Sequence, residues 1–317
     1  MKRLFKNIVL FLCLCAVIFS ACFAAVQCIP PQFTNSCYAG MLDKYERLTS
    51  IDEPKLVLLG GSNLGFGMNS QVLEEAMQMP VVNMGFFASV KSDFYLNLTK
   101  PHIKEGDIVI ICYEYALYSE KNSTPYELLY TIENYPEFWH AVPWYDYPYL
   151  AAEYFDQYAS EKIPRMAIRK FNKPASSIAD AYCRAAFNAW GDNAYPRPND
   201  NIYLQFCPND IFTKENIDPS IMKRLDCFYD DALAQGAKVF ISFPPIAKNH
   251  VGNDASQIAA YKAALDEQTR IPIISEITEY LYEDILFYDS HYHLNDKGAR
   301  LRTEQLISDL QAALGAQ

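Results

Sequence analysis

The length, composition and charge of the chain limit what it can be. It has 317 residues, 50% of them hydrophobic, with 27 basic and 38 acidic side chains and a formal net charge of −11 at pH 7. A chain of this length can bury a substantial core, and it suits one α/β domain with insertions better than two separate domains. Its acidic balance argues against nucleic acid as the main partner.

The N-terminal segment predicts a membrane anchor. Residues 8–26 form a run of nineteen residues without a charge, long enough to cross a bilayer as a helix. Lys2, Arg3 and Lys6 precede this run, which predicts a cytoplasmic N-terminus and an exported body. The run could be an uncleaved signal anchor, a cleaved signal peptide or a lipoprotein signal modified at Cys22. We favour the anchor, because the run continues past Cys22 without the polar end that is typical of a cleavage site.

The rest of the chain alternates between strand-like and helix-like stretches, which indicates a mostly parallel sheet covered on both faces. We expect a cytoplasmic tip and transmembrane helix over residues 1–27, and a membrane-proximal linker and helix over residues 28–54. An α/β domain should then occupy residues 55–317.

Within that domain we expect an aromatic-rich helical insertion at about residues 115–200. Helical spacing runs in it from about Ala151 to Ala189. Its aromatic side chains could line a groove for a glycan or an acyl chain, or they could fill the core, as aromatic side chains more often do.

The stretch KLVLLGGSNLGFG, residues 55–67, contains a candidate nucleophile. A short run rich in Leu and Val is cut off by Gly60 and Gly61, and Ser62 follows immediately. A buried strand that turns sharply and delivers a serine to the start of a helix is a recurrent way to present a nucleophile. The serine would lie beyond the carboxyl end of the strand, where open α/β sheets bind ligands. The alternative interpretation is a plain turn in which Ser62 caps the helix.

The loop DSHYHLNDKG, residues 289–298, contains an acid and two candidate bases just before a long terminal helix. The chain has five histidines, and two of them, His291 and His293, lie in one five-residue window with Asp289. Serine hydrolysis requires a base that takes the proton of the nucleophile and an acid that orients the base. Either histidine can reach back to Asp289 from this loop, so the spacing leaves the base open.

The cysteine pattern gives no sign of a metal site. Nine cysteines are present without a CxxC pair or a Cys/His cluster, so we expect neither a metal nor a cofactor. Cys28 with Cys37 and Cys183 with Cys207 are the pairs nearest in sequence for disulfides in an exported body, although connectivity cannot be read from spacing.

The order of these pieces resembles the SGNH (GDSL-like) hydrolase superfamily, in its membrane-anchored bacterial branch related to O-acyl transfer proteins of the cell envelope and exopolysaccharides. GGSNLGFG resembles the first block, which carries the nucleophile, here Ser62. VVNMGF resembles the second block, whose Gly85 would donate its backbone N–H to the oxyanion hole beside that of Ser62. DSHYHLNDKG resembles the last block, which supplies Asp289 and a histidine, and its HLNDKG ending favours His293. The resemblance implies a three-layer α/β/α, flavodoxin-like SGNH fold with a mostly parallel sheet.

Two features depart from the superfamily pattern. The third block usually supplies an oxyanion asparagine, often as GxND, whereas this chain reads CYEYALY and has Glu114 at that place. An ionised carboxylate cannot donate a hydrogen bond, so Asn63 is the nearest alternative donor by sequence. Glu114 would support the core or bind a substrate hydroxyl. The usual acid-to-base interval is also D-x-x-H, which fits neither His293 nor His291, the alternative base.

The resemblance implies an extracytoplasmic, membrane-tethered serine esterase or O-acyltransferase that acts on acyl esters of an envelope glycan or polymer. Its substrate partner would be that polymer or a small acyl ester, and it would contact the membrane through the N-terminal helix. A membrane-bound acyltransferase is a further candidate partner. The alternative, from another class, is a catalytically inactive protein that keeps the SGNH fold and binds within a polysaccharide-modification system. The missing third-block asparagine supports that alternative.

Overall fold

The computed structural model describes residues 2–87, 89–119, 125–133, 135–171, 180–198 and 209–315. Its helices and strands in chain order are α1 (Lys2–Gln27), α2 (Gly40–Ser50), β1 (Leu56–Gly60), α3 (Ser62–Gly67), α4 (Ser70–Met77), β2 (Val81–Asn83), α5 (Ser92–Thr99), β3 (Ile108–Cys112), α6 (Leu128–Ile132), α7 (Tyr147–Glu153), α8 (Ser160–Phe171), α9 (Pro219–Ala234), β4 (Lys238–Ile241), β5 (Ile246–Ala247), α10 (Ala255–Gln268), β6 (Leu281–Tyr282) and α11 (Asp296–Gly315).

A parallel four-stranded sheet in the order β2-β1-β3-β4 lies at the centre of the body. Ile273 extends it beyond β4 through a parallel bridge to Ile241. This is the strand order of flavodoxin-like doubly wound sheets, in which ligands bind beyond the carboxyl ends of the strands where the order reverses, between β1 and β3. The α/β class and the parallel sheet predicted from the sequence are confirmed.

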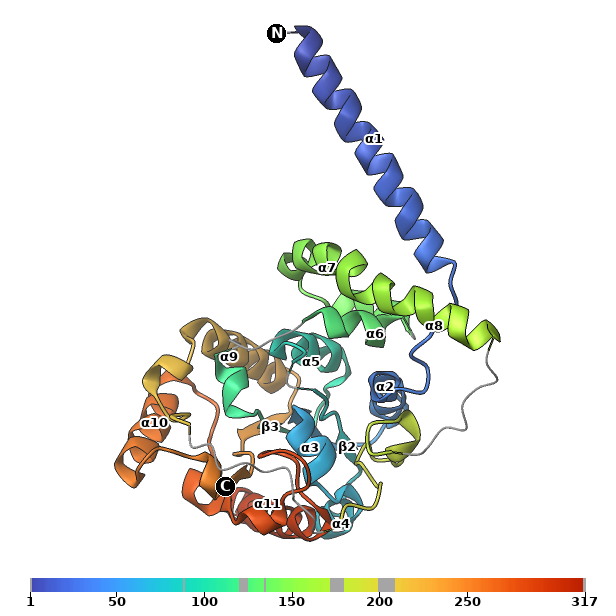
Figure 1. Ribbon diagram of the computed structural model, residues 1–317. Coiled ribbons are helices and arrows are strands. Elements are labelled where there is room, and N and C mark those ends of the chain that lie inside the picture. The colour runs from blue at the N-terminus through green and yellow to red at the C-terminus, as the bar shows by residue number, and fades with distance from the viewer. Residues whose placement is uncertain are drawn as a thin grey trace.

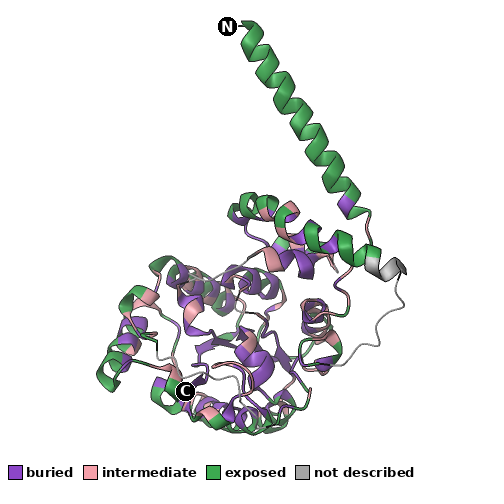
Figure 2. Ribbon diagram, in the orientation of Figure 1, coloured by how far each residue is buried: buried purple, intermediate pink, exposed green. Residues whose placement is uncertain are grey.

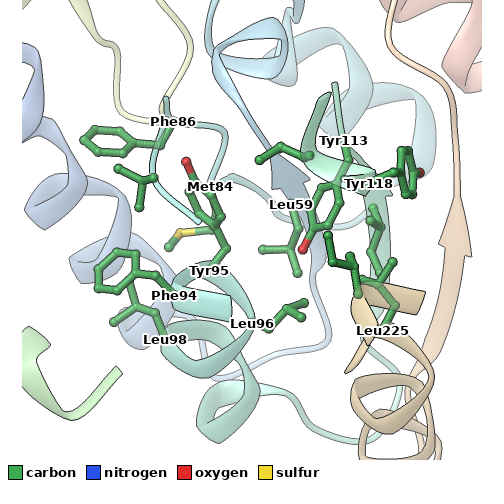
Figure 3. Packing of buried hydrophobic residues seen from close by; sticks show 14 of the residues in the cluster. Leu59, Met84, Phe86, Phe94, Tyr95, Leu96, Leu98, Tyr113, Tyr118 and Leu225 are labelled. Atoms are coloured by element: carbon green, nitrogen blue, oxygen red, sulfur yellow. The ribbon is translucent and has the colours of Figure 1, made fainter. Parts of the chain in front are cut away.

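The two faces of the sheet carry separate apolar cores because successive strand residues point to opposite sides. On one face, Leu59 and Tyr113 pack with Tyr95 of α5 and Leu225 of α9 (Figure 3). On the other face, Leu58 and its neighbours pack against helices α3, α4 and α11. Figure 1 shows the resulting arrangement of helices around the sheet.

The N-terminal helix extends away from this body (Figure 1). α1 has 26 residues and is long and apolar enough to cross a membrane. It is exposed along its length, and Val26 near its end is its buried residue (Figure 2). Helices α6, α7 and α8 form a layer between α1 and the sheet (Figure 1).

The helical insertion is shorter than the sequence predicted. Helix continues from α7 through the π-helical segment Tyr154–Ala159 and α8 to Phe171. The expected helix to Ala189 is wrong, because residues 180–198 form turns and one short 3-10 segment. Residues 182–184 pair instead with residues 35–37 of the linker, which explains part of the difference.

The linker after α1 pairs with the segment that follows the insertion. Residues 35–37 lie antiparallel to residues 182–184, with a bridge between Ser36 and Cys183. The N–H of Cys37 donates to the carbonyl of Tyr182 at 3.0 Å, and the N–H of Arg184 donates to the carbonyl of Asn35 at 3.0 Å. The linker therefore holds the segment that carries Tyr182.

The proposed cysteine pairs do not form disulfides in the part of the chain that the structure describes. Cys28 is exposed, Cys37 is buried, and both are free thiols, as is Cys183. Cys207, the suggested partner of Cys183, lies outside the described residues.

Gly60 and Gly61 are required by space where β1 and β3 end. A Cβ atom at Gly60 would lie 2.2 Å from the carbonyl oxygen of Cys112, and one at Gly61 would lie 1.7 Å from Oε2 of Glu114. Real Cβ atoms do not approach other atoms so closely, so a side chain at residue 60 would force the two strand ends apart, and one at residue 61 would displace the carboxyl of Glu114.

We expect the Gly60→Ala substitution to destabilise the full chain by about 3 kcal/mol, the upper end for overpacking, because the added methyl group meets the backbone of a central strand. Gly65→Ala is the matched control in the adjacent helix, where the nearest atoms to a new Cβ lie at 3.6 Å. Urea unfolding in detergent, followed by near-ultraviolet circular dichroism, measures both. Equal stability of the two variants would contradict the close approach of β1 and β3.

Candidate active site

Ser62 is the first residue of α3 and follows β1 directly after Gly61. The helix N-cap is Gly61, in an extended conformation, and α3 has no side-chain cap of its own. The interpretation of Ser62 as an N-cap is therefore wrong, because the helix begins at Ser62 itself. Its half-buried side chain instead forms hydrogen bonds with residues from other parts of the chain.

A continuous hydrogen-bond chain joins Ser62, His293 and Asp289. The distance from Ser62 Oγ to His293 Nε2 is 2.8 Å, and that from His293 Nδ1 to Asp289 Oδ1 is 2.7 Å. A carboxylate accepts from Nδ1–H, which leaves Nε2 as the acceptor for the serine proton. This arrangement is able to take a proton from Ser62 and to stabilise the imidazolium that forms.

Tyr182 holds the other oxygen of the acid. Its hydroxyl donates to Asp289 Oδ2 at 2.5 Å and lies 3.2 Å from His293 Nδ1. Burial alone would raise the pKa of Asp289, but the hydrogen bonds from His293 and Tyr182 outweigh it and keep that pKa below its ordinary value. Asp289 is therefore ionised at neutral pH. Burial and the neighbouring Asp289 raise the pKa of Tyr182, so its hydroxyl remains a donor.

The imidazole of His293 is fixed by packing as well as by hydrogen bonds. The ring of Phe66 stacks on it, with centroids 4.2 Å apart and an angle of 11° between the planes. The buried guanidinium of Arg197 lies 5.5 Å from the centroid of Phe66. The sequence offered a signal for Phe66, since it lies one helical turn after Ser62 in the same block. It offered none for Tyr182 or Arg197.

The end of the DSHYHLNDKG loop is tied to α11 by its Asn and Gly. Asn295 Oδ1 accepts from the N–H of Gly298 at 3.0 Å, and Asn295 Nδ2 donates to the carbonyl of Ile285 at 2.7 Å. A Cβ at Gly298 would lie 2.3 Å from the carbonyl oxygen of Leu286. Asn295 and Gly298 thus hold the loop against the body of the protein, which fixes the position of His293.

His291 occupies a different environment from His293. Its ring stacks on that of His250, with centroids 3.8 Å apart and planes at 14°. Burial, followed by the neighbouring His250 and His293, lowers the pKa of His291 to about 3, so it is neutral at physiological pH. Of the two histidines in the loop, the structure brings His293 to Ser62.

The predicted oxyanion donors other than the N–H of Ser62 are engaged within the protein. The N–H of Gly85 donates to Asn83 Oδ1 at 2.9 Å. The side chain of Asn63 donates to the carbonyl of Cys112 at 3.1 Å, and the N–H of Asn63 donates to Glu114 Oε1 at 2.8 Å. The N–H of Ser62 lies in the first turn of α3, where backbone N–H groups have no intrahelical acceptor.

Glu114 caps α3 from the neighbouring strand. It follows β3, it is 2% exposed, and its Oε1 lies 3.3 Å from Ser62 Oγ while accepting from Asn63. Gly61 has no side chain that could cap the helix, and the carboxyl of Glu114 fills the space above it. Oε2 has no hydrogen-bond partner among the described residues. Burial raises the pKa of Glu114, although hydrogen bonds from Asn63 and Ser62 and the nearby His293 act in the opposite direction.

A polar cavity of about 360 Å³ lies beside this site. Its lining includes Tyr115, which follows Glu114, and His291 and Tyr292, which precede His293. Polar side chains from other segments also line it: Ser119, Asn216 and His250. Within the described ranges, no three His, Cys, Asp or Glu side chains are placed together to hold a metal ion.

Comparisons with known proteins add a distant likeness in structure. No family model and no curated protein sequence matches the chain. Among solved structures, the protein YxiM of Bacillus subtilis is similar at 12% sequence identity with a TM-score of 0.39, covering 83% of this chain. The match covers 57% of YxiM, so the chain spans a little over half the length of that protein.

We expect Glu114→Gln to change the pH dependence of stability. Because the folded pKa of Glu114 is raised, the contribution of Glu114 to the stability of the parent protein falls as pH rises above the ordinary pKa of 4.5, where the unfolded chain loses its proton first. The glutamine keeps an oxygen for the N–H of Asn63 and has no charge to bury. The melting temperature of the variant relative to the parent should therefore increase between about pH 4 and pH 7.

The exposed Glu304→Gln variant is the control, and its difference from the parent should stay flat over the same range. Differential scanning fluorimetry at several pH values measures all three proteins. A difference for Glu114→Gln that is flat, or that decreases as pH rises, would show that the buried carboxyl is not destabilising when ionised.

Proposed function

We propose that this protein is a serine esterase or O-acyltransferase of the SGNH type that acts on acyl esters at the extracytoplasmic face of a membrane. The observation that carries the proposal is the hydrogen-bond chain from Ser62 through His293 to Asp289, at 2.8 and 2.7 Å. It lies beyond the carboxyl edge of the sheet, next to the point where the strand order reverses.

The proposed reaction has two steps. Ser62 Oγ attacks the acyl carbonyl while His293 Nε2 takes its proton, and the tetrahedral intermediate then expels the alcohol, which receives that proton. In the second step, water or an acceptor hydroxyl attacks the acyl-serine and gives its proton to His293. The acyl group leaves as an acid or as a new ester, and Ser62 recovers its proton. Asp289 and Tyr182 keep the imidazole in the tautomer that accepts at Nε2.

The N–H of Ser62 is the oxyanion donor in this proposal. The N–H of Gly85 is held by Asn83, whose buried side chain is fixed in turn by hydrogen bonds to the carbonyl of Leu64 and to Asp192. Each such donor contributes a large factor to the rate of acyl transfer.

The proposed substrate is an acyl ester of an envelope glycan or polymer, or a small acyl ester. A retained α1 would keep the site near the membrane, where such polymers and a membrane-bound acyltransferase are found. The cavity beside His293 supports a hydroxylated ligand, because its lining includes the hydroxyl of Ser119, the amide of Asn216 and the imidazole of His250.

The second candidate function is a catalytically inactive SGNH-fold protein that binds glycan. The observation that favours it is the engagement of Gly85 and Asn63 in internal hydrogen bonds, which leaves the oxyanion hole with one predicted donor.

A fluorophosphonate probe distinguishes the two functions. We expect the full chain in detergent to form a covalent adduct and to hydrolyse an activated acetyl ester. Ser62→Ala should form no adduct and should lose on the order of 10³-fold or more in hydrolysis, because it removes the nucleophile. Intact mass spectrometry measures the adduct, and product absorbance measures hydrolysis.

The control is His291→Gln, which changes the neighbouring histidine of the same loop and should keep the adduct. Absence of an adduct from the folded parent protein, together with equal hydrolysis by the parent and Ser62→Ala, would reject the serine enzyme in favour of the binding protein.

Tyr182→Phe tests the support of the acid. Loss of its hydrogen bond to Asp289 should lower kcat/KM for the activated ester by about 10-fold, since hydrogen bonds to charged groups contribute about 1.5 kcal/mol or more. Tyr288→Phe, which changes the residue directly before Asp289, should leave kcat/KM unchanged. Steady-state kinetics measures both variants. An unaltered kcat/KM for Tyr182→Phe would show that the hydroxyl of Tyr182 does not contribute to catalysis.

A further inference from the structure

We infer that the segment from Trp144 to Phe155, here called the aromatic platform, lies at the boundary between headgroups and acyl chains of the extracytoplasmic leaflet. The platform comprises the 3-10 segment Trp144–Asp146, α7 and the first two residues of the π-helical segment Tyr154–Ala159. This inference rests on α1 being the retained anchor of the proposed enzyme, and it does not depend on the serine chemistry.

The platform touches α1 inside the uncharged run and not merely at its end. The rings of Phe19 and Phe155 meet edge to face with centroids 5.0 Å apart, and those of Phe23 and Tyr154 lie 4.7 Å apart. Gln27 Nε2 donates to the hydroxyl of Tyr154 at 3.2 Å. The contacts therefore follow α1 over its last turns.

These contacts set the depth of the platform. The run of residues 8–26 matches the thickness of the hydrocarbon core, so Val26 lies near its outer surface. Phe19 precedes Val26 by seven residues, or about 10 Å along a helix that rises 1.5 Å per residue. A segment packed against Phe19 must enter the outer part of the bilayer. Interfacial helices are buried to a similar depth, about 5 to 10 Å.

The exposed side chains of the platform suit that location. Trp144 is 78% exposed, Tyr145 is 46%, Tyr147 is 44% and Tyr149 is 42%. Tryptophan and tyrosine concentrate at membrane interfaces, where the ring contacts acyl chains and the polar tip remains hydrated. The carboxylate of Asp146 among them is buried and paired with Lys91, so it does not oppose insertion.

An apolar crevice separates α1 from α7. It has a volume of about 340 Å³, and its lining includes Phe19, Phe23, Trp139, Tyr147 and Leu150. Water gains no hydrogen bonds from such walls, whereas an acyl chain would fill the crevice with apolar contacts. Both the apolar crevice and the exposed rings therefore favour contact with a phospholipid bilayer.

The orientation of the platform is fixed by a buried glutamate. Glu133 Oε1 accepts from the N–H groups of Gln32 and Phe33, at 2.6 and 2.7 Å, just after α1 ends. Its Oε2 accepts from the hydroxyl of Tyr158 at 2.7 Å and forms an ion pair with Lys162 at 3.2 Å. The exit of α1 and the helices of the insertion are therefore held together by one carboxylate.

Tryptophan quenching by labelled lipids tests the inference. The full chain is reconstituted in phosphatidylcholine liposomes that contain lipids brominated near the ester end of the acyl chain. We expect strong quenching of the parent protein and a smaller quenched fraction in Trp144→Phe, which changes an exposed ring, keeps the fold and leaves Trp139 of the crevice as the remaining lipid-quenched ring. Trp190→Phe is the control, because Trp190 bonds to Glu74 in the body and should not meet lipid.

Three results would overturn the inference. The first is equal quenching of the parent and Trp144→Phe. The second is a Trp144 shielded from aqueous acrylamide but not quenched by lipid, which would indicate a protein partner or a second copy. The third is a mature chain that lacks α1 by mass spectrometry. Fluorophosphonate labelling of the same liposomes separates the two proposals, since an adduct without quenching rejects the platform alone, and quenching without an adduct rejects the serine chemistry alone.

Discussion

The close approach of the ends of β1 and β3 is the constraint on which the site depends. A Cβ atom at residue 60 would lie 2.2 Å from the backbone carbonyl oxygen of Cys112 in β3, and one at residue 61 would lie 1.7 Å from the side-chain carboxyl of Glu114. The space left free at Gly61 is taken by the carboxyl of Glu114, which accepts from the N–H of Asn63. Because this contact fixes the first turn of α3, it also fixes where Ser62 presents its hydroxyl to His293.

Glu114 accounts for the most evident departure from the superfamily pattern that the sequence resembles. Where that pattern places an asparagine that would face the oxyanion, this chain places a buried carboxyl that holds a helix start. The two demands on it conflict, since the cap favours a negative charge at the helix N-terminus and burial disfavours any charge. The carboxyl of Glu114 lies 3.3 Å from the hydroxyl of Ser62, so the protonation of Glu114 also affects the polarity around Ser62.

Much of this arrangement could be predicted from the sequence where the signal was local. The run ending in Gly-Gly-Ser identified β1 and the turn, and the spacing of apolar stretches identified the parallel sheet. The loop before α11 identified Asp289 and both histidines, but spacing alone could not separate His291 from His293. Their difference arises from His250 and Phe66, which stack on one ring each. Tyr182 was not predictable because it reaches Asp289 across 107 residues of sequence. The helix expected to Ala189 failed because residues 182–184 pair with the distant residues 35–37, which local spacing does not reveal.

The pairing of residues 35–37 with residues 182–184 has a consequence for how the molecule can be divided. The strand partner of the Tyr182 segment is the chain that has just left α1, and Tyr182 in turn grips Asp289. The end of α1 and the acid of the site are thus connected through a few hydrogen-bonded residues. A fragment that starts after residue 37 would leave the Tyr182 segment with an unpaired edge, so a fragment without α1 has to begin before residues 35–37.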